Sequence, residues 1–293
     1  MRAIDIRAAV SEAAASLRAA GVDSPRVDAE LLLAHVLRVE RGRLLLVDRV
    51  AADELAAFRM LIARRVAREP LQHLTGQAAF RHLELSVGPG VFVPRPETEL
   101  IVDAGLAALA PTATVVDLCS GSGAIALAIA QEVPTARVFA VERSPQALIY
   151  LRRNAAGSAV TVVAGDVGDD EMLRDLEASV DLVVSNPPYV PADVDVSAET
   201  RRDPAEAVFA GVDGLDAIRN VVRAAGRLLR PNGLLVVEHD DGGSGAVLAD
   251  GLRGTGWLDV RECRDLADRP RYVTARRPAG SASGAAAWGR MTP

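Results

Sequence analysis

The sequence predicts an α/β protein in which a mostly parallel sheet with helices on both faces follows a small all-helical domain. Two observations support this prediction. Residues 1 to about 80 carry apolar side chains at helical spacing, and from about residue 111 short apolar, β-rich runs alternate with helical stretches. Runs of apolar residues without polar alternation are typical of strands buried on both faces, as in parallel sheets covered by helices.

The region 1–80 is expected to form a small helical bundle without strands. Asp53 stands where it could cap the start of a helix, and Pro70 would end the helical region. Ser24 followed by Pro25 predicts the start of an earlier helix, because proline suits the first helical position. The apolar residues with helical spacing behind Asp53 are Leu55, Phe58, Leu61, Ile62 and Val66.

The stretch RHLELSVGPGVFVPRPETEL, which begins at residue 81, combines alternating apolar residues with prolines and glycines. This pattern favours a short hairpin and a linker over 81–110 rather than a helix. The region 111–277 follows as the sheet domain, and the stretch 278–293 lacks periodicity and is expected to be a disordered tail. The runs predicted as strands are 114–118, 138–142, 160–163, 181–185, 233–238, 257–262 and 271–276, with the last strand antiparallel.

Composition limits the class of protein. A chain of 293 residues that is 49% hydrophobic can fill two cores, and no apolar run reaches the roughly 20 residues of a membrane span. No signal peptide is evident, so we expect a cytoplasmic protein. Cys119 and Cys263 lack metal-ligand spacing, and no metal is predicted. A net charge of −6 with scattered arginines argues against stable nucleic-acid binding.

The first predicted strand runs into a glycine loop and then a helix, in the sequence DLCSGSGAIA. Gly121 and Gly123 allow a sharp turn and close approach to a ligand, at the sheet edge where parallel α/β folds bind ligands. Glu142 closes the second strand, where an acid would accept hydrogen bonds from ribose hydroxyls. These features also fit an NAD-dependent dehydrogenase, although a chain without lysine cannot carry a Tyr-x-x-x-Lys pair.

Three further strand ends carry polar groups at the same predicted edge. Asp166 follows the third strand, where it could accept a hydrogen bond from an adenine amino group, and Glu238 ends the fifth. The fourth strand ends in Asn-Pro-Pro-Tyr, 186–189, and its two prolines remove two backbone donors and stop strand pairing. Packing alone does not explain polar groups at five successive strand ends, so the sequence predicts a binding site there.

These motifs resemble those of the class I methyltransferases, which have a Rossmann-like fold and use S-adenosylmethionine. The shared features are DLCSGSGAIALAIA, the acid of AVERS, the GD after the third strand and NPPY. With PLQHLTGQAAF, VFVPRPETE, DPAEAVFAGVDGL and the helical N-terminal region, the chain more narrowly resembles the HemK/PrmC family. Members of that family methylate the side-chain amide of a glutamine in peptide chain release factors.

The resemblance implies roles for individual residues. Asn186 would lie between cofactor and substrate, and Val167 would lie beside the adenine. The cofactor-binding set would be Cys119, Ser120, Gly121, Ser122, Gly123, Glu142, Asp166, Val167 and Asn186, and the substrate-binding set would be Asn186, Pro187, Pro188 and Tyr189. Cys119 stands where the family often has glycine, and we expect it to be tolerated only with a negative φ.

The implied reaction is methyl transfer to the glutamine of the Gly-Gly-Gln (GGQ) motif in class I peptide chain release factors, with Asn186, Pro187 and Tyr189 as catalytic residues. The helical domain would dock this protein substrate, and the segment 191–213 has the length of a lid. NPPY is shared with adenine-N6 nucleic-acid methyltransferases. That activity, a glutamine methyltransferase acting on a ribosomal protein, and a non-catalytic binding module remain alternatives.

Overall fold

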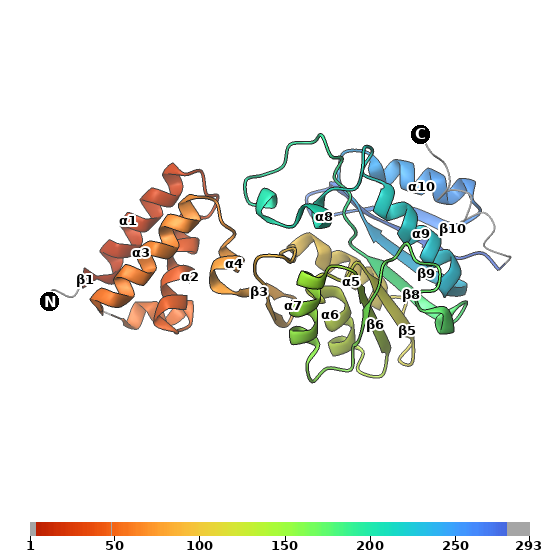
Figure 1. Ribbon diagram of the computed structural model, residues 1–293, viewed down its shortest axis with the longest axis horizontal. Coiled ribbons are helices and arrows are strands. Elements are labelled where there is room, and N and C mark those ends of the chain that lie inside the picture. Colours follow the sequence, from red (N-terminus) through yellow and green to blue (C-terminus); the bar gives the residue numbers. More distant parts are fainter. Residues whose placement is uncertain (1–3, 48, 280–293) are drawn as a thin grey trace. The chain divides into compact units, whose positions relative to one another are not determined.

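The computed structural model describes residues 4–47 and 49–279, and these residues form two compact units (Figure 1). The first unit contains the residues up to Gln77 together with Val196–Arg202, and the second contains Ala78–Asp195 and the described residues from Asp203 onward. The expected disordered tail lies, from residue 280 on, outside the described residues.

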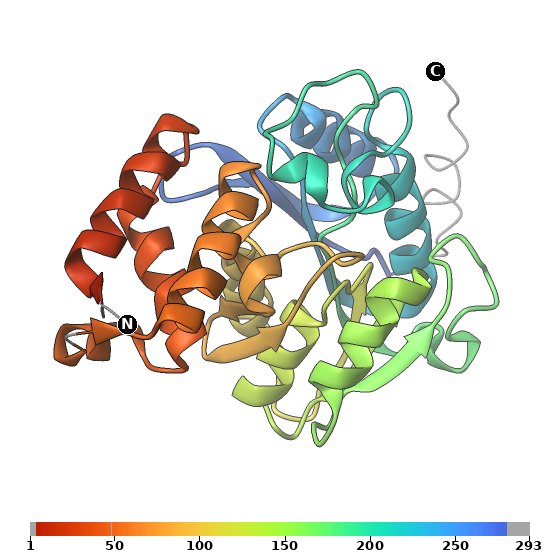
Figure 2. The same cartoon turned by 60° about the vertical axis from the view of Figure 1, so that its left-hand side comes forward.

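The first unit is a helical bundle, as predicted (Figures 1 and 2). Its apolar core contains Leu17, Leu32 and Leu33, which are fully buried, and Phe58, which is 1% exposed. These side chains come from three different helices, so the bundle forms one core. The helical elements are α1 (Ile6–Ala19), α2 (Pro25–Leu37), η1 (Arg41–Leu46), α3 (Ala52–Val66) and α4 (Leu71–Thr75).

Two details of this unit differ from the sequence-based expectation. Two short strands, β1 (Ile4–Asp5) and β2 (Arg49–Val50), pair antiparallel where no strand was expected. Asp53 does not cap α3, because the helix begins at Ala52 and Ala51 occupies the capping position. The backbone N–H of Ala51 donates to the Glu54 carboxylate at 2.9 Å, which leaves Asp53 in the first turn.

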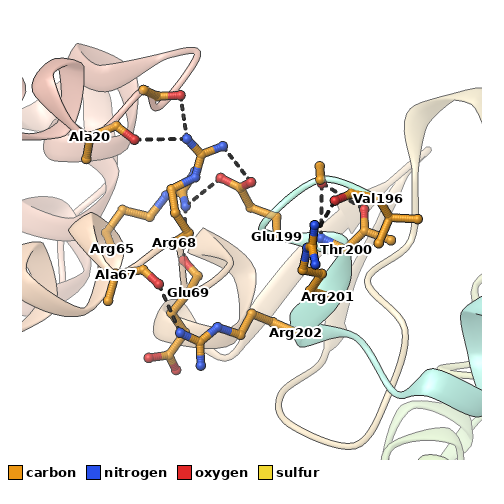
Figure 3. A network of polar contacts seen from close by, with 12 residues as sticks. Ala20, Arg65, Ala67, Arg68, Glu69, Val196, Glu199, Thr200, Arg201 and Arg202 are labelled. Atoms are coloured by element: carbon orange, nitrogen blue, oxygen red, sulfur yellow. Dashed lines mark hydrogen bonds and ion pairs between the residues drawn. The ribbon is translucent and has the colours of Figure 1, made fainter. Parts of the chain in front are cut away.

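The segment Val196–Arg202, which contains η4 (Thr200–Arg202), belongs to the helical unit although it lies far along the chain. The Glu199 carboxylate accepts from Arg65 Nη1 at 2.9 Å and from Arg68 Nη2 at 2.6 Å (Figure 3). Arg65 is buried and also donates to Asp28 at 2.8 Å, while Arg202 donates to the Ala67 carbonyl at 3.0 Å. Glu199 thereby shares a largely buried charge cluster with the two arginines at the end of α3.

The second unit contains a seven-stranded sheet with the order β10-β11-β9-β8-β5-β6-β7. Its neighbouring strands are parallel except that β11 runs antiparallel to both β9 and β10, which confirms the predicted sheet. The order reverses between β5 and β8, where open parallel sheets have their ligand crevice. The strands are β5 (Thr114–Leu118), β6 (Arg137–Glu142), β7 (Thr161–Ala164), β8 (Val180–Ser185), β9 (Leu229–Glu238), β10 (Leu258–Arg264) and β11 (Pro270–Arg276).

Helices cover both faces of this sheet (Figures 1 and 2). Within β8, Val183 packs toward the helices α9 and α10, whereas Leu182 and Val184 pack toward α5, α6 and α7. This alternation of apolar side chains buries both faces. The helical elements of this unit are η2 (Pro96–Thr98), α5 (Glu99–Leu106), α6 (Ala124–Glu132), α7 (Pro145–Ala155), η3 (Arg174–Leu176), α8 (Ala205–Val208), α9 (Asp216–Leu228) and α10 (Ser244–Gly254).

The region expected to be hairpin and linker contains both a hairpin and a helix. The strands β3 (Gln77–Phe80) and β4 (Leu83–Ser86) form the hairpin, which begins before residue 81. The expectation of no helix was wrong, because Pro96 opens a 3₁₀ turn that leads directly into α5. Proline favours the first turn of a helix, so Pro96 was a signal for the helix that follows it, which the sequence-based expectation did not take into account. Among the described helices, none is long and apolar enough to cross a membrane.

We expect Glu199→Gln to release the segment Val196–Arg202 from the helical unit. Arg201 and Arg202 are exposed, so limited trypsin digestion followed by mass spectrometry reports local opening at this point. Cleavage should become about fivefold faster, since loss of charge-assisted hydrogen bonds at a partly solvated site costs about 1 kcal/mol. Glu30→Gln, which removes the ion pairs of Glu30 with Arg26 and Arg41, is the matched control. Equal acceleration in both variants would contradict the prediction.

Candidate active site

The polar groups predicted at the strand ends lie at one edge of the sheet. The strands β5, β6, β7, β8 and β9 are mutually parallel through their neighbours, so their carboxyl ends share that edge. The glycine loop after β5 and Asn186 after β8 lie on either side of the point where the strand order reverses. This arrangement defines the candidate active site.

Glu142 holds the glycine loop through backbone hydrogen bonds. Its Oε2 accepts from the Gly121 N–H at 2.9 Å, and its Oε1 accepts from the N–H groups of Arg143 at 2.8 Å and Ser144 at 2.7 Å. A carboxylate offers about four lone-pair positions, so acceptor capacity remains for a ligand hydroxyl. The buried Glu142 therefore shapes the loop and can also bind a ligand.

Glycine occupies the two positions of the loop for different structural reasons. Gly121 has φ +58°, and a Cβ placed on it would meet no described atom within 4 Å, so open space adjoins its backbone. Gly123 has φ +89°, and its Cβ would approach Leu151 Cδ1 to 2.6 Å, so close packing against α7 requires glycine there. Of these two glycines, Gly121 adjoins open space and Gly123 does not.

The serines of the loop make structural contacts. The Ser120 hydroxyl donates to Asp117 Oδ2 at 2.5 Å, and the Ser122 carbonyl accepts from Asn154 Nδ2 at 2.9 Å. Asp117 is fully buried and also accepts from the Ala126 N–H at 3.2 Å. Burial raises the pKa of Asp117 to about 7. Sequence reasoning did not assign Asp117 to the site, although an acid inside the apolar run TVVDL was the available signal.

Cys119 adopts the left-handed conformation, with φ +62°. The expectation of a negative φ was wrong, because the chain must turn into the glycine loop directly after β5 and a non-glycine residue carries that turn. Burial, together with the carboxylates of Glu142 and Asp117, raises the pKa of the thiol to about 12. A raised pKa favours the protonated thiol over the nucleophilic thiolate.

Asp166 and Val167 follow β7 at the same edge. Asp166 Oδ1 accepts from the Gly168 N–H at 2.7 Å, and its Oδ2 pairs with Arg143 at 3.3 Å near the surface. Val167 is buried in the apolar cluster that faces α9 and α10. The local turn fixes the carboxylate of Asp166, whereas Val167 contributes to packing.

The NPPY segment is held by hydrogen bonds to Thr98, which the sequence analysis did not assign to the site, and to Glu238, which it named only as a polar strand end. Asn186 Nδ2 donates to Thr98 Oγ1 at 3.1 Å, and the Tyr189 hydroxyl donates to Glu238 Oε1 at 3.3 Å. Glu238 is 1% exposed, and burial raises its pKa to about 7. Burial also raises the pKa of Tyr189, so its hydroxyl keeps its proton.

An ion pair between the buried Asp203 and the partly exposed Arg95 joins two of the motif segments. Asp203 Oδ2 accepts from Arg95 Nη2 at 2.5 Å, and Asp203 Oδ1 accepts from the Val93 N–H at 3.3 Å. The Arg95 guanidinium lies 4.8 Å from the centre of the Phe92 ring. The segment that carries Thr98 is thus attached to the start of DPAEAVF. Among residues 4–47 and 49–279, no group of three or more His, Cys, Asp and Glu is placed to hold a metal ion.

Comparison with known proteins agrees with this architecture. Residues 8–76 match the family model described as PrmC N-terminal domain, and residues 84–202 match the methyltransferase small domain. The solved catalytic domain of hMettl16 in complex with a MAT2A 3′UTR hairpin superposes with a TM-score of 0.53 at 14% identity, over 67% of this chain and 76% of that chain. This likeness shows the fold alone. Fold, site and family models together define a class I methyltransferase.

The curated relatives narrow the assignment. The release factor glutamine methyltransferase of Mycolicibacterium smegmatis is 51% identical, over 94% of this chain and 99% of that protein. The one of Streptomyces coelicolor is 52% identical, over 92% of this chain and 97% of that protein. The chain belongs to the family of release factor glutamine methyltransferases, which confirms the resemblance inferred from the motifs.

We expect Cys119→Gly to stabilise the protein. The substitution removes a left-handed strain of about 1–2 kcal/mol. It also costs about 0.5–1 kcal/mol of stability, because glycine increases the conformational entropy of the unfolded chain. The free energy of unfolding measured with urea should rise by about 0.5–1 kcal/mol. Cys119→Ala keeps the strained conformation and should not stabilise. An equal rise in both variants would mean that loss of the thiol, rather than relief of strain, causes the change.

Proposed function

We propose that the protein transfers the methyl group of S-adenosylmethionine to the side-chain amide nitrogen of the glutamine in the GGQ motif of class I peptide chain release factors. The observation that carries the proposal is Asn186, held by Thr98 at the carboxyl end of β8, with two prolines directly behind it. The family to which the chain belongs supports the same reaction. A release factor as substrate implies that the protein acts in the cytoplasm.

The loop geometry fits S-adenosylmethionine. The open space beside Gly121 allows a ligand to approach the backbone, and Glu142 retains acceptor capacity for ribose hydroxyls. We assign cofactor contact to Glu142, Asn186 and the loop, with Asp166 and Val167 at the adenine; the loop residues are Cys119, Ser120, Gly121, Ser122 and Gly123. When bound, S-adenosylmethionine supplies a methyl group on a cationic sulfur.

The residues after β8 orient the acceptor. An amide nitrogen is a weak nucleophile because its lone pair is delocalised into the carbonyl. In our proposal the Asn186 Oδ1 and the Pro187 carbonyl accept the two N–H protons of the glutamine amide, so the face of the nitrogen points toward the methyl donor. Pro188 keeps the chain out of the sheet, and the Tyr189 ring packs along the planar amide. Such orientation is worth about 7–11 kcal/mol in well-aligned intramolecular reactions.

The reaction is tested with S-adenosylmethionine that carries a trideuterated methyl group. Incubation with separate pools of release factor, ribosomal protein, RNA and DNA, followed by mass spectrometry, should find the heavy methyl on the GGQ glutamine alone. Asn186→Ala should lower kcat at least about a hundredfold, as expected for loss of a preorganised polar group. Asn186→Asp should also impair transfer, because a buried carboxylate favours the ground-state sulfonium over its neutralised product.

Changing the GGQ glutamine to asparagine is the acceptor control, since it withdraws the amide by one methylene group and should leave little product. Heavy methyl in RNA or DNA would instead indicate an adenine-N6 activity. An unlabelled methyl group on the glutamine would exclude S-adenosylmethionine as the donor.

We further propose that the helical unit docks the release factor. Leu45 and Leu46 on η1 are each 82% exposed, an unusual exposure for adjacent leucines that a protein partner would cover. The double change Leu45→Ser and Leu46→Ser should raise the KM for intact release factor about tenfold and leave kcat unchanged. The KM for a short peptide that contains GGQ should stay the same. Leu266→Ser, which alters a leucine that is 99% exposed in the other unit, is the control.

Point variants test docking better than deletion of residues 1–77, because that deletion also removes the partners of Glu199. A tenfold higher KM for the short peptide, or the same effect from Leu266→Ser, would reject docking through η1.

A further inference from the structure

Asn154, near the end of α7, joins the end of β4 to the glycine loop through three hydrogen bonds to backbone groups. Its Oδ1 accepts from the Ser86 N–H at 2.8 Å. Its Nδ2 donates to the Ser86 carbonyl at 3.0 Å and to the Ser122 carbonyl at 2.9 Å. An asparagine amide has one acceptor end and one donor end, so these three neighbours permit a single direction of the amide.

The contact with the Ser122 carbonyl begins a chain of hydrogen bonds through two peptide groups of the loop. The peptide group that carries this carbonyl also carries the Gly123 N–H, which donates to the Ser120 carbonyl at 2.8 Å. The peptide group of the Ser120 carbonyl carries the Gly121 N–H, which donates to Glu142 Oε2 at 2.9 Å. Because a peptide group is planar, a hydrogen bond to its oxygen also fixes the direction of its N–H. The chain therefore extends from the amide on α7 to Glu142.

The peptide group between Gly121 and Ser122 lies between these two fixed groups. Among the described residues it makes no hydrogen bond to another backbone group, and open space adjoins Gly121. Its N–H and carbonyl are thus backbone groups of the loop that remain for a ligand. Their direction is set by the fixed peptide groups before and after them, because the backbone can rotate only about the bonds that join successive planes.

The helix that carries Asn154 is itself closely packed against the segment after β4. A Cβ on Gly88 would overlap the Tyr150 hydroxyl, and a Cβ on Gly90 would approach Gln146 Cβ to 2.9 Å. Gln146, Tyr150 and Asn154 follow one another at intervals of four residues, so they lie along one face of α7. The anchor of the hydrogen-bond chain thus stands on a helix with little room to shift.

We propose that Asn154 is a positioning residue for the cofactor. By holding the Ser122 carbonyl, it directs the peptide group between Gly121 and Ser122 toward S-adenosylmethionine. The identity of this ligand rests on the proposed function. The effect should appear in cofactor affinity, because the residues assigned to the acceptor follow a different strand, β8.

The first measurement is the affinity for S-adenosylhomocysteine, titrated into the full-length protein by calorimetry. Asn154→Asp keeps nearly the same shape and can still accept from the Ser86 N–H, but its second oxygen faces two carbonyls. We expect its Kd to rise about tenfold, because buried acceptors then face one another without a donor. Asn154→Ala removes the amide without adding a charge, and its Kd should rise about fivefold.

Ser86→Ala is the matched control on the same segment and helix. It removes the hydrogen bond from Arg153 Nη1 to the Ser86 hydroxyl, at 3.1 Å, and leaves the backbone groups that Asn154 contacts. Its Kd should stay within about twofold of the wild-type value. A wild-type Kd in both Asn154 variants, or an equal rise in Ser86→Ala, would overturn the proposal.

The second measurement reads the loop without any ligand, by nuclear magnetic resonance of ¹⁵N-labelled protein. The amide protons of Gly121 and Gly123 should exchange with solvent faster in Asn154→Ala than in the wild type, because the hydrogen-bond chain has lost its anchor. The amide of Val222 on α9, which packs on the other face of the sheet, is the internal reference. Unchanged exchange at the glycines would overturn the proposal, as would equal acceleration at Val222, which indicates a general loss of stability.

The two proposals fail in different ways. A wild-type protein that binds S-adenosylhomocysteine without methylating release factor would reject the proposed function and leave the role of Asn154 intact. Methylation of release factor by the wild type, together with unchanged cofactor affinity in Asn154→Ala, would reject the role of Asn154 and leave the proposed function intact.

Discussion

The parallel pairing of β5 with β8 is the constraint on which the site depends. Residues Val115–Leu118 pair in register with Leu182–Ser185, so the two strands end side by side. β6 and β7 extend the sheet on one side and β9 on the other, so the strand order reverses between β5 and β8, the point at which open parallel sheets bind ligands. Because all five strands run in the same direction, the glycine loop and NPPY share one edge although they lie far apart in the sequence.

Buried acids then give this edge its detailed shape. Asp117 and Glu142 hold the glycine loop, Asp203 holds the segment around Arg95, and Glu238 holds Tyr189. Burying a carboxylate is costly unless hydrogen bonds or a cation compensate for lost solvation. Each of these acids accepts at least one hydrogen bond, whereas Asp117 Oδ1 and Glu238 Oε2 are buried with no hydrogen-bond partner among the described residues. The site is thus stabilised by polar contacts that specify geometry, in addition to the apolar core on both faces of the sheet.

The segment after NPPY has contacts of two kinds. Glu199 belongs to the helical unit through Arg65 and Arg68, and a few residues later Asp203 is fixed in the sheet unit by Arg95. A segment of this length between elements would be costly to order without such partners. Its ion pairs therefore order a connection that directly follows the NPPY segment.

The sequence by itself determined the helical region, the strands and their order of appearance, and the set of polar strand ends, because apolar periodicity and turn residues are local signals. It also carried the motifs by which the family was inferred. Only the tertiary structure decided the positive φ of Cys119, the helix α5, the membership of Glu199 in the helical unit and the contacts of Thr98 and Glu238 with NPPY. The last two depend on which distant side chains meet after folding, and a local pattern holds no record of partners separated by dozens of residues. Pro96 is a local signal for α5, and the φ of Cys119 follows from the turn directly after β5.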